Sequence, residues 1–220
     1  MWFIIDQNTQ KEKKMEKKQY EKIKGTVLNG YTLDRIASWA IWDSKNLYNT
    51  QFIDDEKTIE RLNPNIVFVA LNFAGIDDDH KNDPSWKSWQ NFHSDRRMDK
   101  RIYDVFSSTI YEGAYMTDII KYSATPDAEA LMEKIKAGEI DMELQLKMFI
   151  EEIKALGSDS IDLYLMGNNP YDIYTKYFMN RSEFSSVKRK IKSYKNIGSA
   201  SPANTGWSNN LETILDLKKV

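Results

Sequence analysis

The stretch NIVFVALNFAG, Asn65–Gly75, decides the expected fold of this chain. Its apolar run from Ile66 to Leu71 is rich in β-branched residues, follows an Asn-Pro pair and leads into Asn72. A short apolar run between turn-forming residues is typical of a strand that is buried on both faces of a sheet. In open α/β sheets, ligands bind outside the carboxyl ends of such strands. The stretch therefore predicts a central strand with a functional position, Asn72, at its end.

The composition indicates a globular chain with one core. At 220 residues a single domain is expected, and a net charge of −2 with 41% hydrophobic residues argues against a disordered chain. The absence of cysteine excludes disulfides and thiolate metal sites, which suits a cytoplasmic protein. The opening MWFII is followed at once by polar residues and is too short for a signal peptide or a membrane span. We therefore expect a cytoplasmic location and no membrane partner.

The N-terminal residues differ in character from the rest of the chain. Residues 10–24 are rich in lysine and carry only a thin apolar stripe, so we interpret them as an exposed helix or a mobile arm rather than as a nucleic-acid-binding element. The sequence thus divides into an N-terminal helical arm, residues 1–30, and a single α/β domain, residues 31–220.

Strand-like and helix-like segments alternate through that domain. Further strands are expected at Gly113–Lys121, Ile161–Met166 and Val187–Ile191. Helices are expected at residues 31–52, Asp54–Leu62, residues 99–111, residues 126–156 with a break near Gly138, Tyr171–Met179 and Trp207–Leu217. This alternation predicts an α/β fold, a three-layer α/β/α sandwich with a mainly parallel central sheet.

Polar and aromatic residues gather at the predicted strand ends. If the strands are parallel, one edge of the sheet holds Asn72, Phe73, Asp118, Lys121, Asn168, Lys192, Ser193 and Tyr194. The polar loop over residues 76–101 is expected to lie over the same edge and to bring Trp89, Phe92 and His93. A carboxylate, an amide, a lysine and aromatic rings suit a pocket for a flat polar ligand. The alternative is that these are ordinary strand ends with caps and turns.

The order and spacing of these segments resemble the uracil-DNA glycosylase superfamily, especially its mismatch-specific and thermophilic branches. FVALNFAG at 68–75 resembles the first motif of those enzymes, a strand that ends in Gly-hydrophobic-Asn-Pro-Gly or a close variant. YMTDIIKY at 115–122 resembles Tyr-Ile-Thr-Asn-Val-Val-Lys-Cys of the thermophilic branch. LYLMGNN at 163–169 resembles the strand that ends in Leu-Gly, and IKSYKN at 191–196 stands where the family has its His-Pro-Ser loop. The resemblance covers residues 36–215.

The resemblance implies a uracil-DNA glycosylase-like fold and DNA base excision, the hydrolysis of the N-glycosidic bond of a modified or mismatched base. It makes Asn72 and Asp118 the catalytic candidates. Asn72 would orient the attacking water by hydrogen bonding, since an amide cannot act as a general base. A downstream aromatic residue, Phe92 or next Trp89, would stack on the extruded base. The implied partner is single- or double-stranded DNA or another nucleobase-containing ligand, and no cofactor is expected.

Three positions depart from the family pattern. Asp118 replaces the asparagine that reads uracil, and an ionised carboxylate accepts hydrogen bonds but donates none. Uracil is therefore not the preferred base unless Asp118 is protonated. Phe73 replaces a proline. The histidine of the last loop is absent, and Lys192–Tyr194 occupies its region, with Ser201–Asn204 as a second candidate for that loop. Lys192 or His93 would then stabilise charge on the departing base.

A second class of function stays open, a binding module that recognises a nucleobase, nucleotide or nucleic-acid end without chemistry. Basic residues in Arg181–Lys195 and in residues 96–101 favour a nucleic-acid surface for either function. The chain has no glycine-rich phosphate loop and no nucleophile elbow, which disfavours acyl transfer. Asp77–His80 is interpreted as an acidic turn, since adjacent aspartates cannot all point at one metal ion. The oligomeric state stays open.

Overall fold

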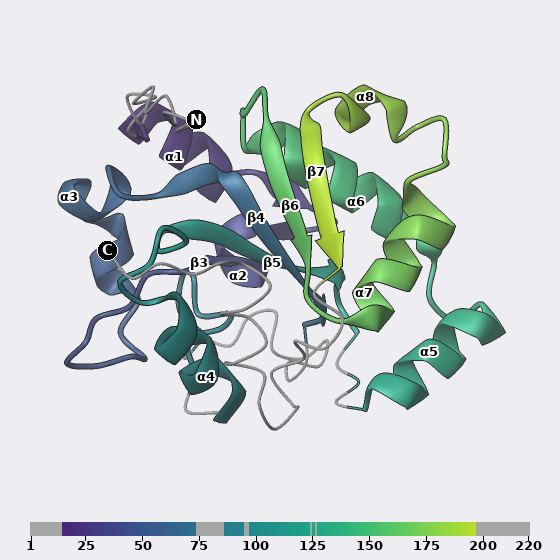
Figure 1. The fold of residues 1–220 in the computed structure, drawn as a ribbon, viewed down its shortest axis with the longest axis horizontal. Coiled ribbons are helices and arrows are strands. Elements are labelled where there is room, and N and C mark those ends of the chain that lie inside the picture. Colours follow the sequence, from purple (N-terminus) through teal and green to yellow (C-terminus); the bar gives the residue numbers. More distant parts are fainter. Residues whose placement is uncertain (1–14, 74–85, 95–96, 124, 126, 197–220) are drawn as a thin grey trace, which may run out of the picture.

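The chain folds around a five-stranded mixed sheet (Figure 1). The computed structural model describes residues 15–73, 86–94, 97–123, 125 and 127–196. In sheet order the strands are β3 (Ser38–Trp39), β5 (Ala114–Ile120), β4 (Asn63–Asn72), β6 (Ile161–Leu165) and β7 (Ile191–Asn196). β3 is antiparallel to β5, and the other neighbours are parallel. The predicted α/β class with a mainly parallel sheet is confirmed, whereas a uracil-DNA glycosylase-like fold stays a prediction.

The helices are α1 (Lys17–Lys24), α2 (Leu33–Ile36), α3 (Glu56–Ile59), α4 (Arg97–Phe106), α5 (Ala128–Ala137), α6 (Met142–Ala155), α7 (Asn168–Ile173) and α8 (Ser185–Lys188). A 3₁₀ turn (Gln51–Asp54) precedes α3, and a π-helical stretch (Tyr174–Phe178) continues α7. A separate antiparallel pair, β1 (Val27–Leu28) and β2 (Tyr31–Thr32), lies between α1 and α2.

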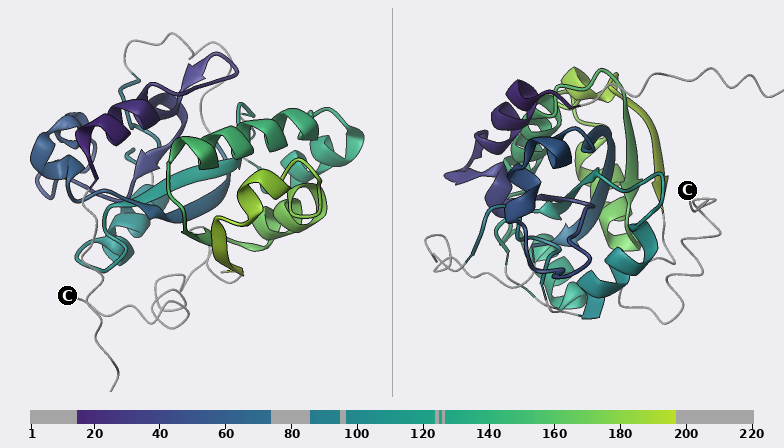
Figure 2. Two further views of the ribbon diagram at one scale, coloured as in Figure 1. Left: turned by 90° about the horizontal axis from the view of Figure 1, so that it is seen from above. Right: turned by 90° about the vertical axis from the view of Figure 1, so that its left-hand side faces the viewer.

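The sheet separates two apolar cores. The α4-side core includes Phe68, Ile102, Phe106, Met116 and Tyr164, and the α6-side core includes Tyr20, Val67, Val69, Phe149 and Leu163. Consecutive residues of β4 alternate between them, as expected for a strand buried on both faces. Figure 2 shows α1 and α6 on one side of the sheet and α4 on the other. Helices therefore cover both faces.

The connections of the central strands explain this arrangement. The chain passes from β4 to β5 on one side of β4, and then from β5 across to β6 on the other side. Crossovers of the same hand that run in opposite directions along a sheet place their helices on opposite faces. α4 lies in the first crossover and α6 in the second, and they pack on opposite faces. The order reverses between β4 and β6, where open α/β sheets bind ligands at the carboxyl ends of the strands.

Several expected elements are confirmed by local chemistry. The three strands predicted at Asn65–Gly75, Gly113–Lys121 and Ile161–Met166 correspond to β4, β5 and β6. The expected break near Gly138 is present, because this residue ends α5 with a φ of 75°. Asp127 and Asp141 cap the starts of α5 and α6, and each side chain accepts two backbone N–H hydrogen bonds.

The predicted helix over residues 31–52 is wrong. The structure divides the segment into β2, the four-residue α2, β3 and irregular chain. Ser38 and Trp39 pair with Met116 and Tyr115 of β5. Trp39 consequently packs in the α6-side core and the next residue, Ala40, in the α4-side core. Pairing with β5 thus overrides the helical spacing of the apolar residues, because a paired strand exposes alternate side chains to opposite faces.

The position predicted for the last strand is also wrong. The end of α8 and a turn occupy Val187–Ile191 up to its last residue, and β7 begins only at Ile191. β7 pairs in parallel with β6 through Ile191 to Asn196. This later start places Lys192–Tyr194 inside the strand instead of after it.

The helix expected within residues 10–24 is confirmed as α1, and its lysine-rich face is exposed while its thin apolar stripe is buried. Tyr20 and Ile23 of α1 are fully buried in the α6-side core. The hydroxyl of Tyr20 donates to Asp54 Oδ1 at 2.6 Å and accepts a hydrogen bond from Trp89 Nε1 at 2.7 Å. α1 is therefore anchored to the core by apolar packing and by two hydrogen bonds at one buried hydroxyl.

The remaining helix predictions differ in their bounds. The helix expected over residues 99–111 is α4, which ends at Phe106, and Asp54–Leu62 holds only α3 and the end of the 3₁₀ turn. Trp207–Leu217 and residues 76–85 of the predicted loop lie outside the described residues. No helix in the described part of the chain has the length and apolar character needed to cross a membrane.

Candidate functional site

Strands β4 and β5 bring Asn72 and Asp118 to one face at their carboxyl ends. Ala70 is the register partner of Asp118, and Asn72 lies two residues farther along β4. By strand alternation Ala70 and Asn72 share the face of Phe68, and Asp118 shares that of Met116, in the α4-side core. Two residues along and one strand across is a separation of about 8 Å. The Asn72 amide and the Asp118 carboxyl group therefore lie on either side of the small Ala70 side chain, near the carboxyl ends of the two strands.

Asn72 is oriented by its own backbone contacts. Its Nδ2 donates to the carbonyl oxygens of Ser123, at 2.9 Å, and Thr125, at 2.8 Å. Both amide hydrogens are thus used, and Oδ1 is left as an acceptor only. Within the described residues no hydrogen bond reaches this oxygen. The partly exposed Asn72 can accept a hydrogen bond from water and can donate none to a ligand.

Asp118 is buried, with 2% of its surface exposed. Its Oδ2 accepts a hydrogen bond from Asn91 Nδ2 at 2.9 Å. Burial raises the pKa of the Asp118 carboxyl to about 7, although the Asn91 hydrogen bond and the Lys121 ammonium group act in the opposite direction. Near neutral pH the group is therefore a mixture of both forms. Its protonated form offers one donor and one acceptor, as asparagine does.

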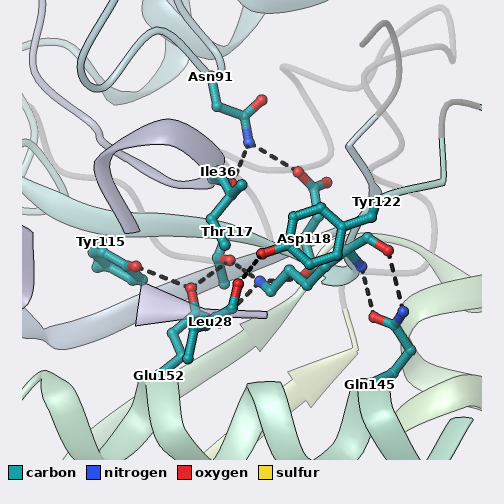
Figure 3. A network of polar contacts seen from close by, with 10 residues as sticks. Leu28, Ile36, Asn91, Tyr115, Thr117, Asp118, Tyr122, Gln145 and Glu152 are labelled. Atoms are coloured by element: carbon teal, nitrogen blue, oxygen red, sulfur yellow. Dashed lines mark hydrogen bonds and ion pairs between the residues drawn. The ribbon is translucent and has the colours of Figure 1, made fainter. Parts of the chain in front are cut away.

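Asn91 is a site residue that the sequence prediction missed. It lies on the described segment 86–94, and its Nδ2 contacts the carbonyl oxygen of Ile36, at 3.1 Å, as well as Asp118 (Figure 3). The next residue, Phe92, is partly buried against the α4-side core, the face that also carries Asp118. The sequence made Phe92 a candidate and not Asn91, because no local pattern indicates which polar residue of a loop contacts a distant strand.

Trp89 and His93 are buried in the core. Trp89 is fully buried, with its ring centroid 5.9 Å from that of Tyr20 and 5.8 Å from that of Trp39. His93 is 1% exposed, lies against Trp42, and has Nε2 3.2 Å from the Trp39 carbonyl oxygen. Burial lowers the pKa of His93 to about 4, so the ring is neutral near pH 7.

Lys121 lies in a buried polar network instead of at the ligand edge. Its Nζ forms an ion pair with Glu152 Oε2 of α6 at 2.8 Å, and both side chains are fully buried. It also donates to Thr117 Oγ1 and to the Asp118 carbonyl oxygen. Glu152 Oε1 accepts hydrogen bonds from Tyr115, at 2.9 Å, and Thr117, at 2.7 Å (Figure 3). Strand alternation could have indicated this placement of the Lys121 side chain. Asp118 and Lys121 are three positions apart, so they face opposite sides of the sheet.

Two other candidates lie near the ends of the central strands. Phe73 is buried, packs edge-on against Trp86 with ring centroids 5.6 Å apart, and donates its N–H to the Ile120 carbonyl oxygen at 3.3 Å. It extends the packing of β4. Asn168 is exposed at the start of α7, three positions after the last residue of β6, and therefore lies at the predicted edge.

Lys192, Ser193 and Tyr194 are not at the carboxyl end of the last strand, and their predicted location is wrong. Ser193 pairs with Asp162 near the start of β6, and β7 ends at Asn196. The later start of β7 is the reason. Lys192 and Tyr194 are exposed. The other candidate for the last loop, Ser201–Asn204, lies outside the described residues.

The structure thus brings together Asn72, Asp118 and the unpredicted Asn91, with Phe92 on the same face. These side chains offer a fixed acceptor, a carboxyl that titrates near neutral pH and an aromatic ring. No group of three metal-ligating side chains is found among the described residues, and Asp77–His80 lies outside them. No family model matches the chain, and neither the curated proteins nor the solved structures include a significant match.

Proposed function

We propose that this chain is a DNA base-excision protein of uracil-DNA glycosylase-like fold, which hydrolyses the N-glycosidic bond of a modified or mismatched base. The observation that carries the proposal is the placement of Asn72 and Asp118 on one face at the carboxyl ends of adjacent parallel strands. Phe92 adds an aromatic ring on the same face. Such a set supports base flipping, because a flipped base needs stacking and hydrogen bonds at its edge.

The contacts suggest a role for each residue. Phe92 stacks on the extruded base, and Asp118 Oδ1 contacts its hydrogen-bonding edge. Asn72 Oδ1 accepts a hydrogen bond from water and directs the water oxygen toward the sugar C1′ carbon. That oxygen forms the new bond to C1′ while the base leaves with the electrons of the C1′–N bond, and the proton that the water releases passes through solvent to the departing base. Protonated Asp118 donates a hydrogen bond to the departing base, a task that its pKa of about 7 suits.

The alternative, a module that binds a base without chemistry, has one observation in its favour. His93, which was expected to assist charge stabilisation, is held in the core, and the other candidate, Lys192, lies inside β7. Asn72 can orient water but cannot take its proton. Binding through Asp118 and Phe92 needs neither a general base nor a second charge.

A single-turnover excision assay with excess protein tests the proposal. Labelled single- and double-stranded oligonucleotides would carry uracil, hypoxanthine, xanthine, alkylated adenine or a G·T mismatch. We expect alkali-labile breaks at one of these bases, and a loss of at least tenfold in rate for Asn72→Ala, because the water acceptor is removed. Asn65→Ala, an exposed asparagine on the same strand, is the matched control and should keep the wild-type rate.

The outcomes separate the two functions. Retardation of the oligonucleotide without breaks would favour the binding module. Neither breaks nor retardation for any base would refute both proposals.

A further inference from the structure

Asn91 holds its amide group in one orientation. Its Nδ2 donates to the Ile36 carbonyl oxygen at 3.1 Å (Figure 3). Its Oδ1 accepts the Phe92 N–H at 3.1 Å. A backbone carbonyl can only accept and a backbone N–H can only donate, so rotating the amide by 180° would lose both contacts. The second hydrogen of Nδ2 therefore always points at Asp118 Oδ2, 2.9 Å away.

This donor determines where a proton on Asp118 resides. A hydroxyl oxygen accepts hydrogen bonds less well than a carbonyl or carboxylate oxygen, so Oδ2 keeps its contact with Asn91 best when it carries no proton. The proton consequently binds Oδ1. Within the described residues no hydrogen bond reaches Oδ1. The two protonation states then differ, for a ligand, in this single atom: Oδ1 accepts when the carboxyl is ionised and donates when it is protonated.

The charged surroundings of Asp118 are balanced between these states. The Lys121 ammonium group favours the ionised form, whereas the carboxylates of Glu152 on α6 and Asp99 on α4, together with burial, favour the protonated form. The neutral Asn91 hydrogen bond favours the ionised form. The balance holds the pKa of Asp118 at about 7, so both states are populated between pH 6 and 8.

We infer that Asn91 is a positioning residue that makes Asp118 a one-oxygen reader of bases. The site then binds bases with a carbonyl group opposite Oδ1 when the carboxyl is protonated, and bases with an amino group there when it is ionised. The inference rests on the proposed function, since it takes the ligand to be a nucleobase. It extends that function by naming the substrate class, keto or amino bases, that the proton selects.

Two small probes test the reader without DNA. 1-Methyluracil presents a carbonyl group at ring position 4, and 1-methylcytosine presents an amino group there. Their affinities for the full chain would be measured by NMR titration at pH 6 and pH 8. Between pH 6 and pH 8 the protonated fraction of Asp118 falls from about nine-tenths to about one-tenth, and the ionised fraction rises by the same amount. Each affinity should therefore change about tenfold, in opposite directions. The preference ratio should change about a hundredfold.

Variants at position 91 separate positioning from folding. Asn91→Leu removes the donor, so the pKa of Asp118, followed by its carboxyl carbon resonance, should rise, and the pH at which the two bases bind equally well should rise with it. Asn91→Asp keeps the side-chain shape and should also raise that pKa. Gln90→Leu is the matched control, because Gln90 lies on the same segment but donates to the His93 carbonyl oxygen. This variant should keep the wild-type pH profile.

Three results would overturn the inference: a preference ratio that does not change with pH, a wild-type profile in Asn91→Leu, or binding of neither base at any pH. Failure of the proposed function has a different signature. If the excision assay detects no breaks but the two bases still exchange preference with pH, then the chain binds bases without excising them. The inference that Asp118 distinguishes keto from amino bases would hold in that case.

Discussion

Asp118 is a residue of the candidate site whose burial lowers the stability of the folded chain. Its pKa is raised from 3.8 to about 7 in the folded chain, so between these values the folded state binds more protons than the unfolded state. Stability therefore decreases as the pH rises through this range, and above pH 7 the full cost of a buried, ionised carboxyl remains. A group that destabilises the fold at neutral pH is characteristic of functional sites.

Replacing this carboxyl should stabilise the protein only at high pH. Asp118→Asn keeps an acceptor for Asn91, and we expect its free energy of unfolding at pH 8 to exceed that of the wild type by at most about 4 kcal/mol. At pH 4 the two proteins should differ little, because Asp118 is then protonated in the folded chain. Urea unfolding at both pH values measures the effect. Asp127→Asn, at the exposed cap of α5, is the control, and an equal gain at pH 4 would contradict the explanation.

At the scale of the elements, Gly113 joins the end of β3 to the starts of β4 and β5. Its N–H donates to the Ala40 carbonyl oxygen after β3, and its carbonyl oxygen accepts from Asn63 N–H at the start of β4, both at 2.8 Å. Its φ is 86°, and a Cβ at this position would lie 2.2 Å from the Arg61 carbonyl oxygen. The alignment of β3, β4 and β5 therefore depends on a residue without a side chain.

Gly113→Ala should cost more than about 2 kcal/mol of unfolding free energy, because both the backbone conformation and the contact with Arg61 are unfavourable. Gly30→Ala separates the two causes. Gly30 has a similar φ of 90°, but a Cβ there would meet nothing within 4 Å, so only about 1 kcal/mol should be lost. Equal losses in urea unfolding would show that the close approach to Arg61 does not matter.

At the scale of the whole molecule, the buried ion pair between Lys121 and Glu152 connects the end of β5 with α6. The pair lies on the face of the sheet opposite Asp118, and Tyr115 and Thr117 supply hydrogen bonds to Glu152. Buried charges are tolerated only when they are paired and hydrogen-bonded. The pair therefore makes correct packing of α6 on the sheet a condition for satisfying both charges.

Breaking this pair on one side should be severe. Lys121→Met leaves the Glu152 carboxylate buried without its cation, and we expect a loss of about 3–5 kcal/mol in unfolding free energy. The double variant Lys121→Met/Glu152→Gln should recover most of it, since an amide oxygen still accepts from Tyr115 and Thr117. The exposed pair of Lys154 and Glu151 provides the control, and Lys154→Met should cost less than about 1 kcal/mol. Failure of the double variant to recover would refute an electrostatic cause.

Local chemistry alone predicted much of the fold. The apolar run of β4, the strands β5 and β6, and the break at Gly138 follow from residues that are neighbours in the sequence. The expected edge position of Asn72 and Asp118 followed as well, since parallel strands end at one edge. The helix over residues 31–52 failed because its apolar spacing is local, whereas the pairing of Ser38 and Trp39 with β5 is not.

The sequence by itself therefore determined the α/β class, the central strands and the polar residues at two of their ends. Tertiary structure decided which of these residues share a site. It buried Trp89 and His93 in the core, turned Lys121 toward Glu152, and set Asn91 against Asp118. The physical reason is the separation along the sequence over which each effect acts. Periodicity and capping act between residues a few positions apart. Burial, ion pairing and a shifted pKa depend on groups that only the folded chain brings together.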